Sequence, residues 1–458
     1  MTRNEMAQLS RDELIDLILL QAQQIGVLQA EIEALRKKLE QGRKPPTNSG
    51  NSSQPPSRDW KGDLPAERKK RRRGPPQGHP KHVRKFVVNP DHIVEVKPRV
   101  CHTCQFDLSQ ASAVLMNINQ ITELPVAKAE VIEVRRYAVE CPCCGQGQLG
   151  EARPGLESER RFGARLEATV VYYRQEQHMS YVRTQAALKN LHGVEISQGG
   201  IDKIMRRAAS QAIEEVQTIE QEIQQSAVIH SDETGSRVDG NNWWQWVFCS
   251  LTAVLHVMRF NRSADVVQDV MGEHEAEVWV SDCYLPQMKA PSKKHQLCLA
   301  HQLRNLQAVV EQDPKHFWAR HVQILFRYAI HLHNQRQKLS EATFLNRAER
   351  IERLFDQLLH QNLDPPQARR LQRRYQKYRD AIFVFLYRTD VSPTNNISER
   401  YLRPSVIHRK VSGGFRSDWG ARGYAALKSL IDTARLAGSS PFDTIQNLFG
   451  SPSLPLRA

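Results

Sequence analysis

Two short apolar runs near the middle of the chain each lead into the dipeptide Ser-Asp, and this repeated arrangement limits the folds open to the chain. Residues 227–230 lead into Asp232, and residues 278–280 lead into Asp282, fifty positions later. Short apolar runs of this kind predict buried strands. If the two strands are neighbours in one sheet, their ends bring both carboxylates to one place.

A third acid follows much later in the sequence. Ser392-Pro393 predicts a helix start, with Ser392 as the N-cap and Pro393 in the first turn, and Pro404 is expected to end that helix. Helical spacing places four polar side chains on one face of it. These are Asn396, Glu399, Arg400 and Arg403.

Three convergent carboxylates suggest a site for two hard divalent cations, Mg²⁺ or Mn²⁺, roughly 3.5–4 Å apart. Such a pair activates a water or a 3′-hydroxyl on one side of a phosphodiester and stabilises the leaving oxygen on the other. The two arginines would then face phosphate or the charge that develops during the reaction. The chain holds 50 acids, so spacing alone also allows ordinary strand-end aspartates.

The charge balance favours a polyanionic partner. There are 64 Lys and Arg residues against 50 Asp and Glu residues, a formal net charge of +14. Charge does not choose between DNA, RNA and an anionic membrane. Because residues 1–11 are polar, we expect no signal peptide, and the longest stretch without charged residues, 240–258, is too polar to span a bilayer. We therefore expect a cytoplasmic protein with no membrane association.

Two Cys-x-x-Cys pairs lie 36 residues apart, Cys101 with Cys104 and Cys141 with Cys144. Each such turn supplies two thiolates, and two turns complete the tetrahedral set of a structural zinc site. A site of this kind contributes folding energy and takes no part in catalysis. Cys143 is a spare thiol beside the second pair, and buried cysteines or a redox pair are the alternatives.

The N-terminal region predicts a coiled coil. Apolar residues recur at alternating spacings of three and four, with Gln21 in the one polar slot. They are Leu14, Ile18, Ile25, Leu28, Ile32, Leu35 and Leu39. We expect this seam to form a homo-oligomer, because the following segment offers nothing to pack on. An amphipathic helix packed on its own domain is the alternative.

Residues 41–80 are rich in Pro, Ser, Asn, Gly and cationic residues, and cannot bury enough apolar surface to order themselves. An unbroken cationic run lies inside this linker. It consists of Arg68, Lys69, Lys70, Arg71, Arg72 and Arg73. The run predicts an arm that grips DNA phosphates, with a solvated linker as the alternative.

Helices are expected on both sides of the first acid. Residues 181–191 predict one helix and Ser197 caps a second that begins near Gly199. A helix-turn-helix DNA reader and plain helical packing explain this pattern equally well.

Residues 243–251 and 254–260 predict two further strands, and residues 297–387 predict a long helical region.

Several of these segments resemble the insertion-sequence-66 family of DDE transposases. They occur in the family's order, from the leucine seam and the Lys44-Pro45-Pro46-Thr47-Asn48-Ser49 linker through the four-cysteine module to the C-terminal signature. The motifs are His230-Ser231-Asp232-Glu233-Thr234, Val280-Ser281-Asp282, Cys298-Leu299-Ala300-His301-Gln302-Leu303-Arg304, Asn395-Asn396-Ile397-Ser398-Glu399-Arg400, Arg403-Pro404, Arg409-Lys410, Ser412–Ala421 and Ser429–Ala434.

The resemblance implies an α/β multidomain protein with an RNase H-like core, a mixed sheet flanked by helices, which an all-helical insertion interrupts between Asp282 and Glu399. It implies that Asp232, Asp282 and Glu399 hold the catalytic metal ions. His301, Arg304, Arg403 and Lys410 are carried over as DNA-contacting or site-supporting residues.

The implied activity is metal-dependent cleavage at the ends of a bacterial insertion sequence, followed by strand transfer into target DNA. The implied partners are double-stranded DNA, as terminal inverted repeats and target, and helper proteins of the same element, in the cytoplasm at the nucleoid. A zinc-bearing DNA-binding regulator and a simple RNase H-like nuclease or resolvase are the alternatives. Cys283 and residues 285–295 depart from the expected pattern.

These interpretations divide the chain into eight segments. They are a coiled coil (1–42), a basic linker (43–85), a four-cysteine zinc module (86–150), a helical region with a possible helix-turn-helix (160–225), the first part of the core (226–300), a helical insertion (301–391), the last part of the core (392–440) and a C-terminal tail (441–458).

Overall fold

A computed structural model describes residues 24–25, 28–29, 31–32, 85–125, 127–151, 157, 160–313, 317–364 and 366–450. The chain divides into two compact units. One comprises Met1–Trp60, Ile132–Ala186 and Glu195–Ala458, and the other Lys61–Val131 and Ala187–Val194. The cationic run at 68–73, the C-terminal residues 451–458 and most of the leucine seam lie outside the described residues. The six described seam-region positions are helical, and the coiled coil stays a prediction.

A five-stranded mixed sheet forms the centre of the first unit, in the order β5-β4-β3-β6-β7. Its strands are β3 (Val228–Val238), β4 (Asn241–Cys249), β5 (Val254–Arg259), β6 (Ala276–Ser281) and β7 (Ser292–Leu297). β3, β4 and β5 pair antiparallel, whereas β3–β6 and β6–β7 pair parallel. The four strands expected from the sequence are confirmed.

The hairpin between β3 and β4 turns at Asp239-Gly240. Both residues have positive φ, 46° and 74°, as a two-residue turn that matches the strand twist requires. β3 therefore continues well beyond its predicted end at residue 230, and Asp232 lies inside the strand. The expectation that Asp232 follows the strand was wrong, because pairing with β4 keeps the polar stretch extended.

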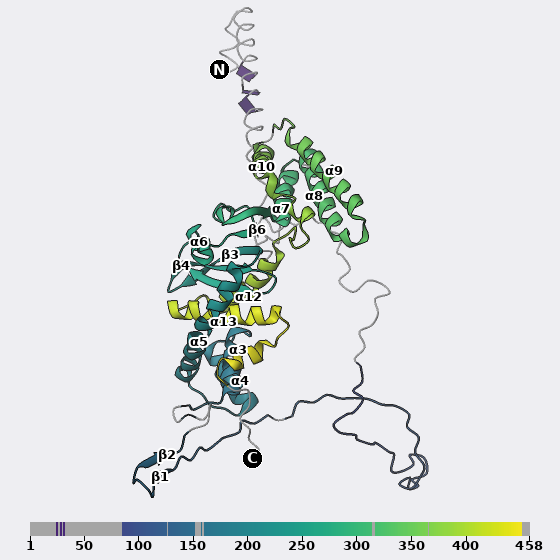
Figure 1. Cartoon of the computed structure of the whole chain (residues 1–458). Helices are drawn as coiled ribbons and strands as arrows, with labels where there is room; N and C mark the ends of the chain where they lie inside the picture. Colours follow the sequence, from purple (N-terminus) through teal and green to yellow (C-terminus); the bar gives the residue numbers. More distant parts are fainter. Residues whose placement is uncertain are drawn as a thin grey trace, which may run out of the picture. The chain divides into compact units, whose positions relative to one another are not determined.

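Helices flank the sheet (Figure 1). α12 (Asn396–Ser412) contacts β3 and β4, and α13 (Asp418–Leu436) contacts β5 and the long α5 (Gln198–Gln224). The remaining helices of this region are α3 (Ala164–Gln175), α4 (Tyr181–His192), α6 (Asp265–Met271) and α14 (Pro441–Asn447), with the 3-10 turn η2 (Gln287–Lys289). No helix within the described ranges is both long and apolar enough for a bilayer span.

α4 and α5 confirm the two helices expected around residue 193. The side chain of Ser197 caps α5 by accepting a hydrogen bond from the Gly200 N–H at 3.1 Å. The Tyr181 hydroxyl donates to Asp202 across the pair, at 3.1 Å. The DNA-reading role of this pair stays a prediction.

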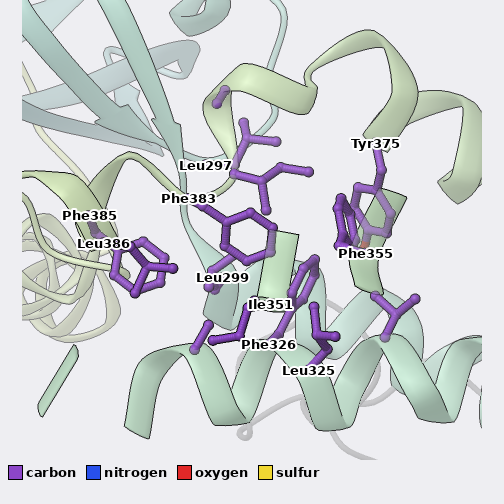
Figure 2. Close-up of a cluster of buried hydrophobic side chains, with 14 of the residues drawn as sticks. Leu297, Leu299, Leu325, Phe326, Ile351, Phe355, Tyr375, Phe383, Phe385 and Leu386 are labelled. Atoms are coloured by element: carbon purple, nitrogen blue, oxygen red, sulfur yellow. The ribbon is translucent and has the colours of Figure 1, made fainter. Parts of the chain in front are cut away.

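The helical region between the second and third acids is also confirmed. It comprises α7 (Leu299–Gln312), α8 (Phe317–Asn334), η3 (Arg336–Lys338), α9 (Glu341–Leu359), α10 (Pro366–Lys377), η4 (Arg379–Ala381) and α11 (Val384–Tyr387). Phe326 packs near its centre against Phe355, Tyr375 and Phe383 (Figure 2). Val278 and Val280 of β6 belong to the same buried cluster, so this region shares a core with the sheet.

The predicted limits of α12 were wrong at both ends. The helix begins at Asn396, three residues later than the predicted start at Pro393, because Ser392 instead accepts a hydrogen bond from Thr394 N–H in a turn. It also passes through Pro404 to Ser412. Proline in a helix interior costs about 3 kcal/mol, but buried Tyr401 and His408 hold the helix against the fold on both sides of it.

Candidate active site

The register of the two parallel strands brings the first two acids level. His230 of β3 lies opposite Val280 of β6, and Asp232 and Asp282 each follow two residues later. Asp282 comes directly after β6, as predicted, and its side chain accepts a hydrogen bond from the Tyr284 N–H at 2.8 Å. The central pair of strands therefore carries both aspartates at one level.

Glu399 lies in the first turn of α12, and a buried asparagine fixes that helix to β3. Asn395, the N-cap residue, donates from Nδ2 to the Ser231 carbonyl oxygen at 2.7 Å. Its Oδ1 atom accepts from the Ser398 hydroxyl at 2.9 Å and lies 3.3 Å from His230 Nδ1. The start of α12 is thereby tied to the residue next to Asp232. The sequence motif contained Asn395, but its anchoring role was missed.

The charges of neighbouring acids act on Asp232. Burial raises the pKa of Asp232 well above its usual value, and the negative charges of Glu233, Asp282 and Glu399 raise it further. Such an effect requires the carboxylates to lie near each other in a poorly hydrated place. Asp282 and Glu399 therefore lie within electrostatic reach of Asp232.

The Glu399 carboxylate is contacted by the first helix of the insertion. Arg304 Nη2 on α7 donates to Glu399 Oε1 at 3.2 Å, and His301 Nε2 lies 3.8 Å from the same oxygen. Burial lowers the pKa of His301, and the positive charge of Arg304 lowers it further. His301 and Arg304, two of the residues predicted to support the site or contact DNA, thus lie against Glu399.

A buried network on the opposite side of β3 was missed by the sequence analysis. Arg262 forms an ion pair with Glu233, and its Nε donates to Glu233 Oε1 at 2.7 Å. Its guanidinium lies over the rings of Trp244 and Tyr284, 4.7 and 3.8 Å from their centroids. Gln287 also donates to Glu233. The network links β3 to the loop that carries Asp282, and only Glu233 was in a quoted motif.

The other predicted DNA-contacting residues lie along α12. Arg400, Arg403 and Lys410 are all exposed on the helix that carries Glu399. Arg68–Arg73 fall outside the described residues, and their role stays a prediction.

The donor set suits hard divalent cations, because it consists of carboxylates whose mutual repulsion a cation would relieve. This fit is supported by the negative charges of Glu233, Asp282 and Glu399, which raise the pKa of Asp232. Within the part of the chain that the structure describes, however, no three His, Cys, Asp or Glu side chains are grouped closely enough to hold an ion. Glu399 is instead turned towards Arg304.

The two cysteine pairs form turns with the same hydrogen bonds. Cys101 N–H donates to the Phe106 carbonyl and Gln105 N–H to the Cys101 carbonyl, at 2.9 and 3.0 Å. In the second turn Cys141 N–H donates to Gln146 and Gly145 N–H to Cys141, at 2.9 and 2.8 Å. The fifth residue of each turn, Gln105 or Gly145, has positive φ.

Backbone hydrogen bonds within each turn lower the pKa of its first cysteine, Cys101 or Cys141. The largest contribution comes from Cys104 in the first turn and from Cys144 in the second. A lowered thiol pKa favours the thiolate that zinc binds. The second turn lies between the short strands β1 (Ala138–Glu140) and β2 (Gly147–Leu149). Because the two turns fall in different units, their joint zinc site stays a prediction.

Comparison with known families gives one match. Residues 159–423, more than half of the chain, match the family described as Transposase IS66 family. The matched region runs from α3 into α13 and includes all three acids, whereas the four cysteines lie before it. Comparison with curated proteins gives no significant match. The chain therefore belongs to the IS66 family of transposases.

Proposed function

We propose that the protein is the DNA transposase of a bacterial insertion sequence, which cuts DNA at the element ends and joins the ends to target DNA by a DDE mechanism. Membership in a transposase family implies a DNA partner and use of divalent metal. The observation that carries the proposal is the level placement of Asp232 and Asp282, with Glu399 near enough to raise the pKa of Asp232.

In this proposal Asp232, Asp282 and Glu399 hold two Mg²⁺ or Mn²⁺ ions, which supply Lewis acidity at the scissile phosphate. Asn395 keeps Glu399 beside β3 through its hydrogen bond to Ser231. The Arg262–Glu233 pair keeps the Asp282 loop against the same strand. Arg400, Arg403 and Lys410 bind phosphates along α12, and Arg304 and His301 contact the Glu399 carboxylate.

The mixed sheet, the helices that flank it and the all-helical segment before α12 support an RNase H-like core. Outside this core we propose a structural Zn²⁺ on Cys101, Cys104, Cys141 and Cys144, because both turns have the same backbone geometry. The N-terminal seam would form a homo-oligomer that holds two element ends together, in the cytoplasm at the nucleoid, with or without helper proteins of the element.

The proposal is tested by incubating the purified protein with a labelled duplex made from the DNA that flanks its gene, in Mg²⁺ or Mn²⁺. Discrete cuts that leave 3′-hydroxyls, followed by joined products with a target plasmid, are expected for the wild type and not for Asp232→Asn. Nicks without joined products would point to a simple nuclease. Sequence-specific binding without any cut in either metal would favour a DNA-binding regulator.

A further inference from the structure

α10 is the most one-sidedly charged helix of the insertion. It carries Arg369, Arg370, Arg373, Arg374 and Lys377 within twelve residues, with no Asp or Glu among them. Its buried face consists of Ala368, Leu371, Gln372 and Tyr375. The cationic side chains therefore project from the rest of the helix surface, and all except Arg374 are exposed.

These cations have no acidic partners among the described residues. Within the described ranges no ion pair involves any of the five, and Arg369 donates a hydrogen bond to the Asp364 carbonyl oxygen at 2.8 Å. Arg379, two residues beyond the helix, is different, because it pairs with Glu352 and Asp356 of α9. The insertion therefore neutralises a nearby arginine but leaves the α10 face with uncompensated positive charge.

α10 also lies beside the candidate active site. Its Leu371 and Tyr375 belong to the buried cluster against which Cys283, the neighbour of Asp282, packs. The positive charges of Arg374 and Lys377 act on the Cys283 thiol, although burial is stronger and raises its pKa. The helix further contacts α7, the helix that carries Arg304 (Figure 1).

We infer that the outer face of α10, formed by Arg369, Arg370, Arg373 and Lys377, binds the phosphate backbone of duplex DNA next to the site of cleavage. The inference rests on the proposed function and adds a DNA contact to it. Residues 369, 373 and 377 follow one another at helical i, i+4 spacing, a stripe about 12 Å long. That length matches several phosphates of one strand, which are roughly 3.4 Å apart along the duplex axis.

The lack of aromatic side chains on this face favours duplex over single-stranded DNA. Proteins that bind single strands stack the bases on exposed aromatic rings. The aromatic residue of α10, Tyr375, is fully buried, so the exposed charged groups of the helix are guanidinium and ammonium groups. Such a face recognises phosphate without reading the base sequence.

The test compares two full-length variants that each lose three positive charges from one insertion helix. R369Q/R370Q/R373Q removes them from α10. R347Q/R350Q/R353Q removes three exposed arginines from α9, where Glu349, Glu352 and Asp356 are interleaved with them. The dissociation constant of each for a 30-base-pair duplex is measured by fluorescence anisotropy over a range of salt concentrations. Thermal unfolding by circular dichroism checks that both variants fold.

The α10 variant is expected to bind at least tenfold more weakly at low salt, with a salt slope shallower by about 2–3, because each lost phosphate contact removes about 0.9. The α9 variant should stay within about twofold of the wild type. Equal losses in both variants, or an unchanged slope for the α10 variant, would overturn the inference. A loss confined to a 30-nucleotide single strand would also overturn it.

This outcome is separate from that of the proposed function. Wild-type protein that cuts DNA while the α10 variant binds with an unchanged slope contradicts the inference alone. Protein that never cuts, but whose duplex binding depends on α10, contradicts the proposed chemistry alone.

Discussion

The guanidinium of Arg304 on α7 donates a hydrogen bond to the carboxylate of Glu399 on α12, with 3.2 Å between Nη2 and Oε1. The first helix of the insertion therefore touches the third acid of the candidate site directly. Since Glu399 Oε1 is engaged by a cation of the protein itself, a metal ion that binds this oxygen would compete with Arg304. The insertion is thus electrostatically coupled to the third acid of the proposed metal site.

Removal of this competing charge should strengthen metal binding. Arg304→Gln is expected to lower the Mg²⁺ concentration for half-maximal cleavage about fivefold, since an exposed charge pair is worth about 1 kcal/mol. Arg304→Lys keeps the charge and should remain near the wild type. The measurement is the cleavage rate over a Mg²⁺ titration, and an unchanged or raised half-maximal concentration in Arg304→Gln argues against competition.

Loss of Arg262 should destabilise the fold near Asp282. The side chain of Glu233 is almost completely buried, and Arg262 is its cationic partner. Arg262→Ala is expected to cost about 2 kcal/mol in the free energy of unfolding, less than for a fully buried pair because Arg262 is one-third exposed. Urea denaturation measures this. The double variant E233Q/R262A should recover part of the loss, and no recovery would show that the pair is not the cause.

The contact between α5 and α13 depends on a glycine. A Cβ atom added at Gly423 would lie 2.5 Å from the Cβ of Ala209, too close for the helices to stay in place. Gly423→Ala is expected to lower the free energy of unfolding by about 1–3 kcal/mol, despite the better helix propensity of alanine. G423A/A209G should restore much of it. Thermal unfolding of the double-variant cycle tests this, and simple additivity of the two changes would contradict it.

His408 should make the fold sensitive to acid. Burial lowers its pKa to about 3, with the charges of His178 and Arg174 acting in the same direction, and its ring stacks on Tyr424 at 4.5 Å. Below about pH 6.5 the unfolded chain binds a proton here that the folded chain does not. This group therefore removes stability as the pH falls from about 6.5 towards 3.

His408→Phe keeps an aromatic ring at this position and removes the titration. At pH 8 neither residue is charged, so the difference in the free energy of unfolding between variant and wild type at that pH serves as the reference. At pH 5 this difference should shift by about 2 kcal/mol in favour of the variant. Urea denaturation at both pH values gives this number. A difference between the two proteins that does not change with pH would mean that His408 is not the source of the effect.

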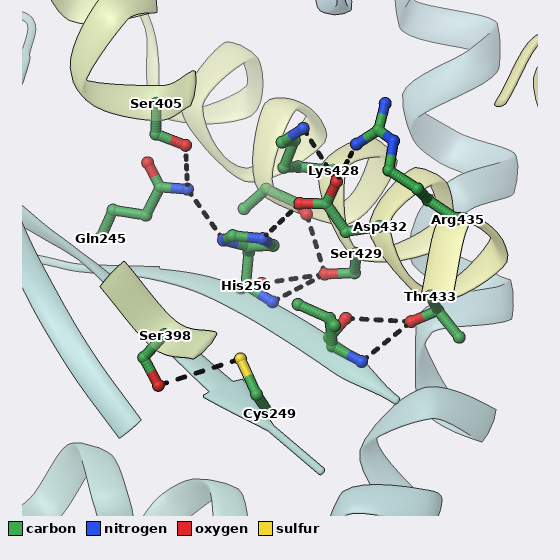
Figure 3. Close-up of polar contacts among 12 residues, drawn as sticks. Gln245, Cys249, His256, Ser398, Ser405, Lys428, Ser429, Asp432, Thr433 and Arg435 are labelled. Atoms are coloured by element: carbon green, nitrogen blue, oxygen red, sulfur yellow. Dashed lines mark hydrogen bonds and ion pairs between the residues drawn. The ribbon is translucent and has the colours of Figure 1, made fainter. Parts of the chain in front are cut away.

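A second buried polar group joins β5 to α13. His256 lies between Gln245 and Asp432, with 3.1 Å from its Nε2 to Asp432 Oδ2 (Figure 3). Lys428, also buried, donates to Asp432 Oδ1 at 3.0 Å. Although burial raises the pKa of Asp432, hydrogen bonding by His256 and the Lys428 charge outweigh it, so the net pKa is lowered. This network anchors α13 to β5. No local sequence pattern predicts these charged contacts.

Features with a local sequence signal were predictable from the sequence. Four strands, the cap at Ser197 and the helical insertion all follow from apolar periodicity and capping residues. β7 was missed because its sequence, Ser292–Leu297, is polar until its last residue. Exposed Lys293 and Lys294 are typical of an edge strand, which hides its strand character from a pattern search.

Long-range partners could not be predicted in the same way. Asn395 donates a hydrogen bond to Ser231, which is 164 positions away in the sequence, and Arg262 donates to Glu233, which is 29 positions away. Such contacts depend on strand order and on which helix packs beside which strand. The acids themselves were recognisable because short apolar runs lead into the two aspartates and a family resemblance pointed to all three acids, whereas their supporting residues appear only once the fold places them together.

The central claim is that Asp232, Asp282 and Glu399 form one metal-dependent cleavage site. Its most direct test measures cleavage of the element-end duplex by Asp232→Asn, Asp282→Asn and Glu399→Gln, with exposed Asp269→Asn on α6 as a matched control. Each of the three should lose at least about a thousandfold in rate while binding the duplex within about twofold of the wild type. Asp269→Asn should cut normally. Cleavage retained by any of the three would contradict the assignment of that acid, and cleavage retained by all three would overturn the site.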